Sequence, residues 1–200
     1  QYDYLIIGSG LAGMYCALQA AKNGPVALVT KRELRECNTR YAQGGISCVM
    51  SDINDQDTFD LHVQDTLIAG AGLCNETVVD QIVSAGPEAI QNLIDLGVQF
   101  TRRSEIDEQS ADHESDQYSL GKEGGHCQRR ILHAGDITGN EVIRALELAC
   151  RANDQIEIYE EHHAIDLITT GKLGWGNEEN QTLGAYVLDT NKDEVKRFLS

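Results

Sequence analysis

The sequence has little proline, a small share of basic residues and no long hydrophobic run. Only two of its 200 residues are proline, 24% are charged and 41% are hydrophobic, which is typical of a globular chain. No stretch approaches the ~20 uninterrupted apolar residues that cross a bilayer. The opening residues 1–8 lack the basic region of a signal peptide. We therefore expect a cytoplasmic protein with no membrane partner.

The charge balance is strongly acidic. There are 32 aspartates and glutamates against 16 lysines and arginines, for a net charge of −16. Such a surface repels phosphate backbones, so we expect no nucleic-acid partner.

The six cysteines show neither a C-x-x-C pair nor the spacing of a metal site. This pattern predicts reduced thiols in a reducing compartment and no bound metal.

The first thirty residues predict a strand, a helix and a second strand. Residues 2–7 form an apolar run typical of a strand buried on both faces. Residues 11–23 are rich in alanine, leucine and methionine, and Gly24 is placed to end that helix in a left-handed conformation. Residues 26–30 predict the second strand. The three elements make a βαβ unit.

The rest of the chain predicts further helices and strands in a mixed arrangement. Residues 31–56 have no sustained period and are expected to form an irregular segment with a function. Helices are predicted at 57–70, at 76–95 with a break near Gly86-Pro87, and at 139–152 behind a capping box at Thr138–Glu141. Residues 101–122 are expected to be a polar surface segment. Strands are predicted at 156–159, 164–170, 184–190 and 194–199, the last three as an antiparallel meander. The predicted fold class is α/β, a Rossmann-like fold with a parallel sheet and a small antiparallel β-meander.

A glycine loop, Gly8-Ser-Gly10-Leu-Ala-Gly13, joins the first strand to the first helix. Gly8 allows the tight turn, Gly10 lets the backbone approach a pyrophosphate, and Gly13 lets the helix pack closely on the sheet. The pyrophosphate would then lie at the positive end of the helix dipole. The loop predicts dinucleotide binding, with a merely tight turn as the alternative.

The end of the second strand lacks the acidic residue that usually holds the ribose of NAD. Thr30-Lys31 stands there, and Glu33 follows two residues later. This departure weakens the case for NAD as the cofactor.

Three separated motifs carry a resemblance to a known family. They are Asn38–Gly45 (Asn-Thr-Arg-Tyr-Ala-Gln-Gly-Gly), Asp65–Gly72 and Glu123–His133. In this order and approximate spacing they resemble the L-aspartate oxidases of the succinate dehydrogenase and fumarate reductase flavoprotein superfamily. The resemblance implies FAD as the cofactor and one FAD-binding domain over residues 1–200. Because the chain stops after Ser200 without a terminal cap, we expect this domain to be incomplete, truncated before the capping domain and the C-terminal helical domain.

The resemblance also implies which residues bind the cofactor. The pyrophosphate would be contacted by Ser9, Gly10, Leu11 and Ala12. Lys31 would contact the adenosine end, and the backbone of His163-Ala164 would contact the adenine. The residues that would surround the flavin are Asn38, Thr39, Arg40, Tyr41, Ala42, Gln43, Gly44 and Gly45. Backbone donors and small polar groups suit a flavin ring that accepts charge. An ordinary glycine loop is the alternative.

Glu123 is the candidate substrate residue. In the resembled family a glutamate of this motif is thought to meet the substrate's amino group, which succinate lacks, and a surface glutamate is the alternative. Arg129 and Arg130 would bind a substrate carboxylate or serve the structure. His126 and His133 are as consistent with buried polar groups as with proton carriers.

The implied full-length enzyme oxidises L-aspartate to iminoaspartate, the first step of de novo NAD synthesis. Oxygen or fumarate would reoxidise the flavin, and quinolinate synthase is a candidate partner. The catalytic residues of the implied oxidase are expected beyond Ser200. Two alternatives stay open: a fumarate reductase or succinate dehydrogenase flavoprotein, distinguished by Glu123 and Asn38, and an FAD-binding fragment without catalysis of its own.

Overall fold

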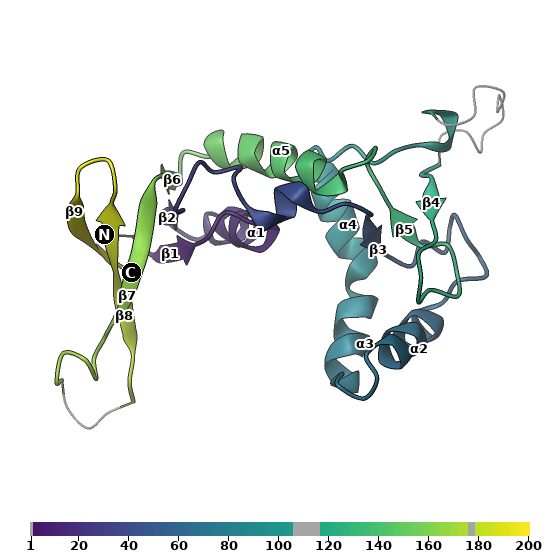
Figure 1. The fold of residues 1–200 in the computed structure, drawn as a ribbon, viewed down its shortest axis with the longest axis horizontal. Helices are drawn as coiled ribbons and strands as arrows, with labels where there is room; N and C mark the ends of the chain where they lie inside the picture. Colours follow the sequence, from purple (N-terminus) through teal and green to yellow (C-terminus); the bar gives the residue numbers. More distant parts are fainter. Residues whose placement is uncertain (1, 106–116, 176–178) are drawn as a thin grey trace. The chain divides into compact units, whose positions relative to one another are not determined.

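The computed structural model describes residues 2–105, 117–175 and 179–200. The chain divides into two compact units, one of residues 1–40 with 143–200 and one of residues 41–142. Figure 1 labels the helices and strands of both units.

A parallel sheet forms the centre of the first unit. Its strands are β1 (Tyr4–Ile7), β2 (Val26–Val29) and β6 (Ile156–Tyr159), in the order β1-β2-β6. Helix α1 (Leu11–Ala20) connects β1 to β2. All four residues of β2 are buried, as expected of a middle strand covered on both faces. The predicted βαβ unit is confirmed.

An antiparallel sheet covers one face of β2 (Figure 1). It consists of β7 (His162–Thr169), β8 (Thr182–Asp189) and β9 (Glu194–Leu199), paired in that order. Alternate residues of β2 pack against this sheet, and the resulting cluster comprises Ala27, Val29, Ala185, Val187 and Phe198. The predicted fold class, a parallel sheet with an antiparallel β-meander, is confirmed.

The predicted role of Gly24 is wrong. Helix α1 ends at Ala20 with Ala21 as its C-cap, and Gly24 does not adopt a left-handed conformation. The glycine is instead explained by close packing, because a Cβ at this position would overlap the side chain of Asp3. The Asp3 backbone N–H donates to the Pro25 carbonyl at 3.0 Å, which brings the start of the chain against this turn.

The second unit combines three helices with a small antiparallel sheet. The helices are α2 (Phe59–Ala69), α3 (Glu76–Ser84) and α4 (Gly86–Asp95), and the break between α3 and α4 falls at the predicted place. The sheet has the order β3-β5-β4, with β3 at Ile46–Ser47, β5 at Ile131–Leu132 and β4 at Leu120–Gly121.

Three short or connecting elements complete the described part of the chain. The 3-10 helix η1 (Asn38–Tyr41) lies in the predicted irregular segment, and η2 (Arg103–Glu105) lies in the predicted polar segment. Helix α5 (Thr138–Arg151) matches the predicted helix within one residue at each end. Of the polar segment 101–122, residues 106–116 lie outside the described residues.

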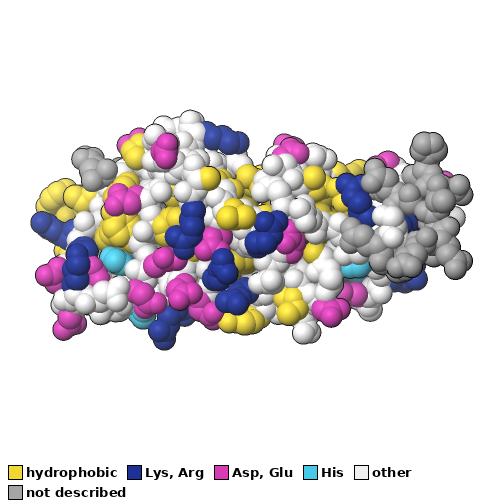
Figure 2. All heavy atoms as spheres, turned by 90° about the horizontal axis from the view of Figure 1, so that it is seen from above, with side chains coloured by type: hydrophobic (Ala, Val, Ile, Leu, Met, Phe, Trp, Pro, Cys, Tyr) yellow, Lys and Arg dark blue, Asp and Glu magenta, His cyan; other side chains and the backbone are white. Residues whose placement is uncertain are grey.

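The surface carries both signs of charge. On the face in Figure 2, lysine and arginine side chains are interspersed with aspartates and glutamates. Within the described ranges, the structure contains no helix of the length and hydropathy that a membrane span requires. All six cysteines lie in these ranges, and each is a free thiol.

Candidate functional site

A hollow of about 650 Å³ lies beside the glycine loop in the first unit. It opens at the carboxyl ends of β1 and β2, the edge at which parallel sheets bind ligands. Segments 7–10, 29–32, 36–39 and 162–164 line it. The structure thus brings seven of the predicted cofactor residues to one place: Ser9, Gly10, Lys31, Asn38, Thr39, His163 and Ala164.

The turn out of β1 is fixed by backbone geometry. Gly8 has a φ of 111°, a conformation that disfavours other residues, and its N–H donates to the Val29 carbonyl at 2.8 Å. A Cβ at Gly13 would overlap the Gly8 carbonyl oxygen, so glycine is required for helix α1 to pack against this turn. The roles predicted for these two glycines agree with the structure.

The N-terminus of α1 faces this turn with little side-chain capping. The N-cap is Gly10, which has no side chain to accept a hydrogen bond, and Thr39 Oγ1 accepts from the Leu11 N–H at 3.3 Å. Leu11 and Ala12 form the first helical turn. Such a helix end, with backbone N–H groups and a positive dipole, suits a phosphate group.

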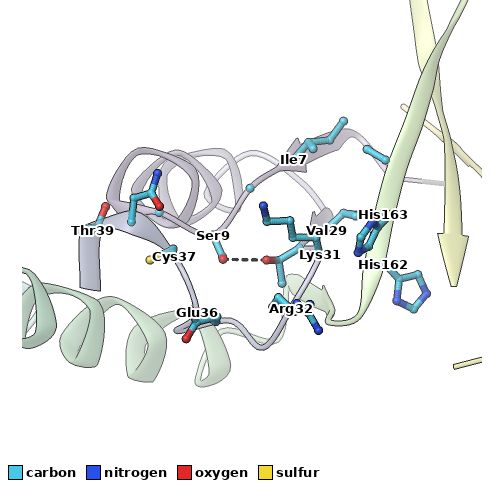
Figure 3. A pocket seen from close by; sticks show the side chains of 15 residues that line it. Ile7, Ser9, Val29, Lys31, Arg32, Glu36, Cys37, Thr39, His162 and His163 are labelled. Atoms are coloured by element: carbon cyan, nitrogen blue, oxygen red, sulfur yellow. Dashed lines mark hydrogen bonds between the residues drawn. The ribbon is translucent and has the colours of Figure 1, made fainter. Parts of the chain in front are cut away.

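Side chains at the strand ends complete the hollow. Ser9 and Thr30 are both buried, and their hydroxyls lie 2.8 Å apart (Figure 3). In Figure 3, Lys31 extends from the end of β2 towards the glycine turn, and His163 projects from the start of β7. His163 is exposed, whereas the neighbouring His162 is buried. A nucleotide fits this set of glycines, hydroxyls and one lysine.

The remaining predicted flavin residues, Tyr41 to Gly45, belong to the second unit. Gly44 has a φ of 69°, and its carbonyl accepts a 2.6 Å hydrogen bond from the Thr138 hydroxyl. A Cβ at Gly45 would overlap the Leu132 carbonyl oxygen. Gly45 therefore allows a close passage of the backbone beside β5. Arg40, on the preceding η1, forms an ion pair with Glu36 at 3.6 Å.

Glu123 lies against this glycine pair. Its Oε1 is 2.7 Å from the position that a Cβ of Gly44 would take. The side chain is exposed, and Glu123 lies two residues after the end of β4. The structure thus brings the candidate substrate carboxylate next to the segment predicted to surround the flavin.

The two adjacent arginines have different surroundings. Arg129 is exposed, and its Nη1 donates to the Leu120 carbonyl at 3.4 Å. Arg130 is completely buried, donates to both carboxylate oxygens of Asp57 at 2.6 and 2.9 Å, and donates to Asp65 at 2.7 Å. Since the chain's own carboxylates occupy its guanidinium, Arg130 serves the structure and is not available to bind a substrate carboxylate.

Two histidines lie beside this buried arginine. His126 Nδ1 is 3.2 Å from Arg130 Nη1, and the ring centroids of His126 and His62 are 5.7 Å apart. Burial lowers the pKa of His62, and the nearby Arg130 and His126 add to the effect. His62 is thus a buried neutral group.

The electrostatics of the cluster follow from its geometry. Burial would raise the pKa of Asp65, but hydrogen bonds from Cys127 and Arg130 outweigh it and lower the pKa to about 2. Burial likewise opposes the charge of Arg130, yet its bonds to Asp57 and Asp65 raise its pKa. No sequence pattern predicted a role for Asp57 or His62. The sequence held one sign of this cluster, because His62 and Asp65 are one helical turn apart on α2.

Within the described ranges, no group of acidic, cysteine and histidine side chains forms a metal site.

Comparison with known proteins agrees with this geometry. The chain is 43% identical over 196 residues to an L-aspartate oxidase of Vibrio cholerae and 44% identical over 199 residues to one of Pseudomonas aeruginosa. These alignments cover 98% and 99% of this chain and 35% of each relative, so the chain spans about a third of their length. The predicted resemblance to L-aspartate oxidases is confirmed.

Solved structures show the same fold. An Escherichia coli quinol fumarate reductase matches with a TM-score of 0.84 at 25% identity, over 100% of this chain and 31% of that one. A flavocytochrome c3 fumarate reductase matches with a TM-score of 0.78 at 19% identity, over 98% and 31% of the two chains.

A family match covers nearly the whole chain. Residues 3–200 match the FAD binding domain family, which makes FAD the cofactor. The matched range includes the strand, turn and helix around the hollow as well as the segment with Glu123. This chain therefore belongs to the FAD binding domain family of flavoproteins.

Proposed function

We propose that the full-length protein oxidises L-aspartate to iminoaspartate, the first step of de novo NAD synthesis. The substrate loses a hydride from its α carbon and a proton from its amino nitrogen. When bound, FAD would supply the acceptor for the two electrons, with oxygen or fumarate as the proposed final acceptor. The proposal rests on identities of 43% and 44% to L-aspartate oxidases and on the position of Glu123.

The cofactor is held, by this proposal, through backbone groups and small side chains. Ser9, Gly10, Leu11 and Ala12 would contact the pyrophosphate, and Lys31 with His163 and Ala164 would contact the adenosine end. Asn38 to Gly45 would surround the flavin. The hollow beside α1 and the need for glycine at positions 13 and 45 support this assignment.

The position of Glu123 is the single observation that carries the choice of substrate. A carboxylate against Gly44 would lie beside the flavin segment, where it can accept a hydrogen bond from the ammonium of aspartate. Succinate and fumarate have no ammonium, so this contact selects between dicarboxylates of similar size. The residues that move protons would lie in the part of the relatives' length beyond Ser200.

A second candidate is a fumarate reductase or succinate dehydrogenase flavoprotein, favoured by the 0.84 TM-score to a quinol fumarate reductase. A third is a fragment that binds FAD without catalysis. The six free thiols support the cytoplasmic setting that we propose for the oxidase. Quinolinate synthase, as consumer of the unstable imino product, is the proposed partner.

The test is anaerobic reduction of the flavin in the full-length protein. L-Aspartate should bleach the flavin absorbance at concentrations at which succinate does not. Replacing Glu123 by Gln should lower kcat/KM for aspartate by about one to two orders of magnitude, since a charge-assisted hydrogen bond contributes roughly 1.5–3 kcal/mol. Flavin reduction by succinate and not by aspartate would favour the second candidate instead.

A further inference from the structure

Glu123 lies in a turn whose two ends belong to one sheet. The turn, residues 122–130, connects β4 to β5, and β4 and β3 pair with β5 on its two sides. β3 begins directly after Gly45. The turn leads into β5, and the glycine pair leads into β3, which pairs with β5. The turn must therefore fold back for Glu123 to reach Gly44.

Asp65, on helix α2, holds this turn at two points. Its Oδ2 accepts the Cys127 backbone N–H at 2.8 Å and Arg130 Nη1 at 2.7 Å. The first bond fixes the middle of the turn, and the second fixes its end. The Asp65 side chain is 13% exposed and Arg130 is fully buried, so water competes little for the bond between them. The bond from the Cys127 N–H is exposed to solvent.

A third connection runs from Arg130 to β3. A guanidinium can only donate, so His126 Nδ1, 3.2 Å from Arg130 Nη1, is the acceptor. The ring proton of neutral His126 is then on Nε2, which lies 3.4 Å from the Ser47 hydroxyl. His126 thereby links the turn to the strand that follows the glycine pair.

We infer that Asp65 is a positioning residue for substrate selection. By holding the Cys127 N–H and Arg130, it fixes the turn so that the Glu123 carboxylate stays against Gly44. The inference rests on the proposed function, because it acts through the contact of Glu123 with the substrate ammonium. Asp57 keeps the buried charge of Arg130 compensated, so a change at Asp65 loosens the turn without leaving that charge unpaired.

The experiment is a double-mutant cycle in the full-length holoenzyme with Asp65→Asn and Glu123→Gln. For each variant, kcat and KM are measured for L-aspartate oxidation and for fumarate reduction by a chemically reduced enzyme, after normalisation to bound flavin. Asp65→Asn should lower kcat/KM for aspartate about 5- to 10-fold, chiefly through KM, while fumarate turnover changes less than about twofold. The double variant should match Glu123→Gln within about twofold, since no carboxylate is left to misplace.

Two further variants keep the test decisive. Asp60→Asn removes an exposed carboxylate from the same helix and should leave both reactions unchanged. Asp65→Glu retains the charge beside Arg130 but shifts the carboxylate, and it replaces Asp65→Asn if that variant does not fold. Equal losses with aspartate and fumarate, additive losses in the double variant, or no loss at all would overturn the inference. If Glu123→Gln alone leaves aspartate turnover intact, the proposed function fails first, and this inference fails with it.

Discussion

The carboxylate of Glu123 occupies the space in which a side chain at Gly44 would begin. Its Oε1 lies 2.7 Å from that Cβ position, much closer than ordinary van der Waals contact. The Gly44 backbone cannot easily withdraw, because its carbonyl accepts from the Thr138 hydroxyl at 2.6 Å. The position of the carboxylate thus depends on glycine at residue 44.

Gly44→Ala should therefore change both stability and substrate binding. Alanine at a φ of 69° is strained and should lower the free energy of unfolding by about 1–2 kcal/mol. The new methyl group should also displace Glu123 and raise KM for L-aspartate about 3- to 10-fold. Urea unfolding and steady-state kinetics per bound flavin measure the two effects.

Gly72 offers a matched control, since it has a φ of 86° and open space where a Cβ would lie. Gly72→Ala should lose similar stability while KM for aspartate stays the same. Equal changes in KM for the two variants would show that backbone strain, and not the displaced carboxylate, is responsible.

Two glycines of the glycine loop differ in what requires them: the fold requires Gly13, whereas Gly10 is expected to matter only when the cofactor binds. A Cβ at Gly13 overlaps the Gly8 carbonyl oxygen, whereas a Cβ at Gly10 makes an ordinary 3.4 Å contact with Thr39. Gly13→Ala should destabilise even the flavin-free protein, by about 1–3 kcal/mol. Gly10→Ala should leave the flavin-free protein within about 0.5 kcal/mol of the wild type but weaken FAD binding.

Urea unfolding of the deflavinated variants, followed by FAD titration, separates these two roles. If Gly10→Ala destabilised the flavin-free protein as much as Gly13→Ala, both glycines would serve the fold alone.

The fold was predictable where local pattern and tertiary structure agree. The apolar run of β2 predicts burial on both faces, and all four of its residues are buried. Gly8 follows an apolar strand and precedes a helix, and its positive φ of 111° agrees with the predicted tight turn. Gly24 was misassigned because both a helix end and a close contact require glycine, and the contact with Asp3 is invisible in the local sequence.

The buried cluster was not predictable, because its members come together only in the folded chain. Arg129 and Arg130 are identical residues in one motif, yet one is exposed and the other is completely buried. The buried arginine is the one that pairs with Asp57 and Asp65, which lie far from it in the sequence. The placement of Glu123 beside Gly44 likewise depends on the pairing of β3 with β5. The assignment of the cofactor contacts residue by residue remains a prediction.

The flavin should be held without a covalent bond. Membrane-bound succinate oxidisers, which the first motif resembles, carry a histidine that links to the flavin where this chain has Asn38. An amide nitrogen is a poor nucleophile, because its lone pair is delocalised into the carbonyl. Acid precipitation of the full-length protein should release all of the yellow colour into the supernatant. Colour that stays with the precipitate would contradict the prediction.

The low pKa of Asp65 gives a pH dependence with a definite sign. The folded value of about 2 lies below the ordinary value of 3.8, so the folded state binds the Asp65 proton more weakly than the unfolded state. The stabilisation is therefore fully present above the unfolded pKa and is lost as the pH falls from about 4 towards 2. Arg130 stays charged throughout this range, because its partners raise its pKa.

Asp65→Asn removes this titration. Between pH 7 and pH 3, the wild type should lose about 1 kcal/mol more of its free energy of unfolding than Asp65→Asn does. Asp60→Asn, at an exposed position of α2, should follow the wild-type curve. Urea unfolding followed by circular dichroism at several pH values gives the comparison. Parallel curves for wild type and Asp65→Asn would mean that the bonds to Cys127 and Arg130 do not favour the charged carboxylate, and the electrostatic account of the cluster would be wrong.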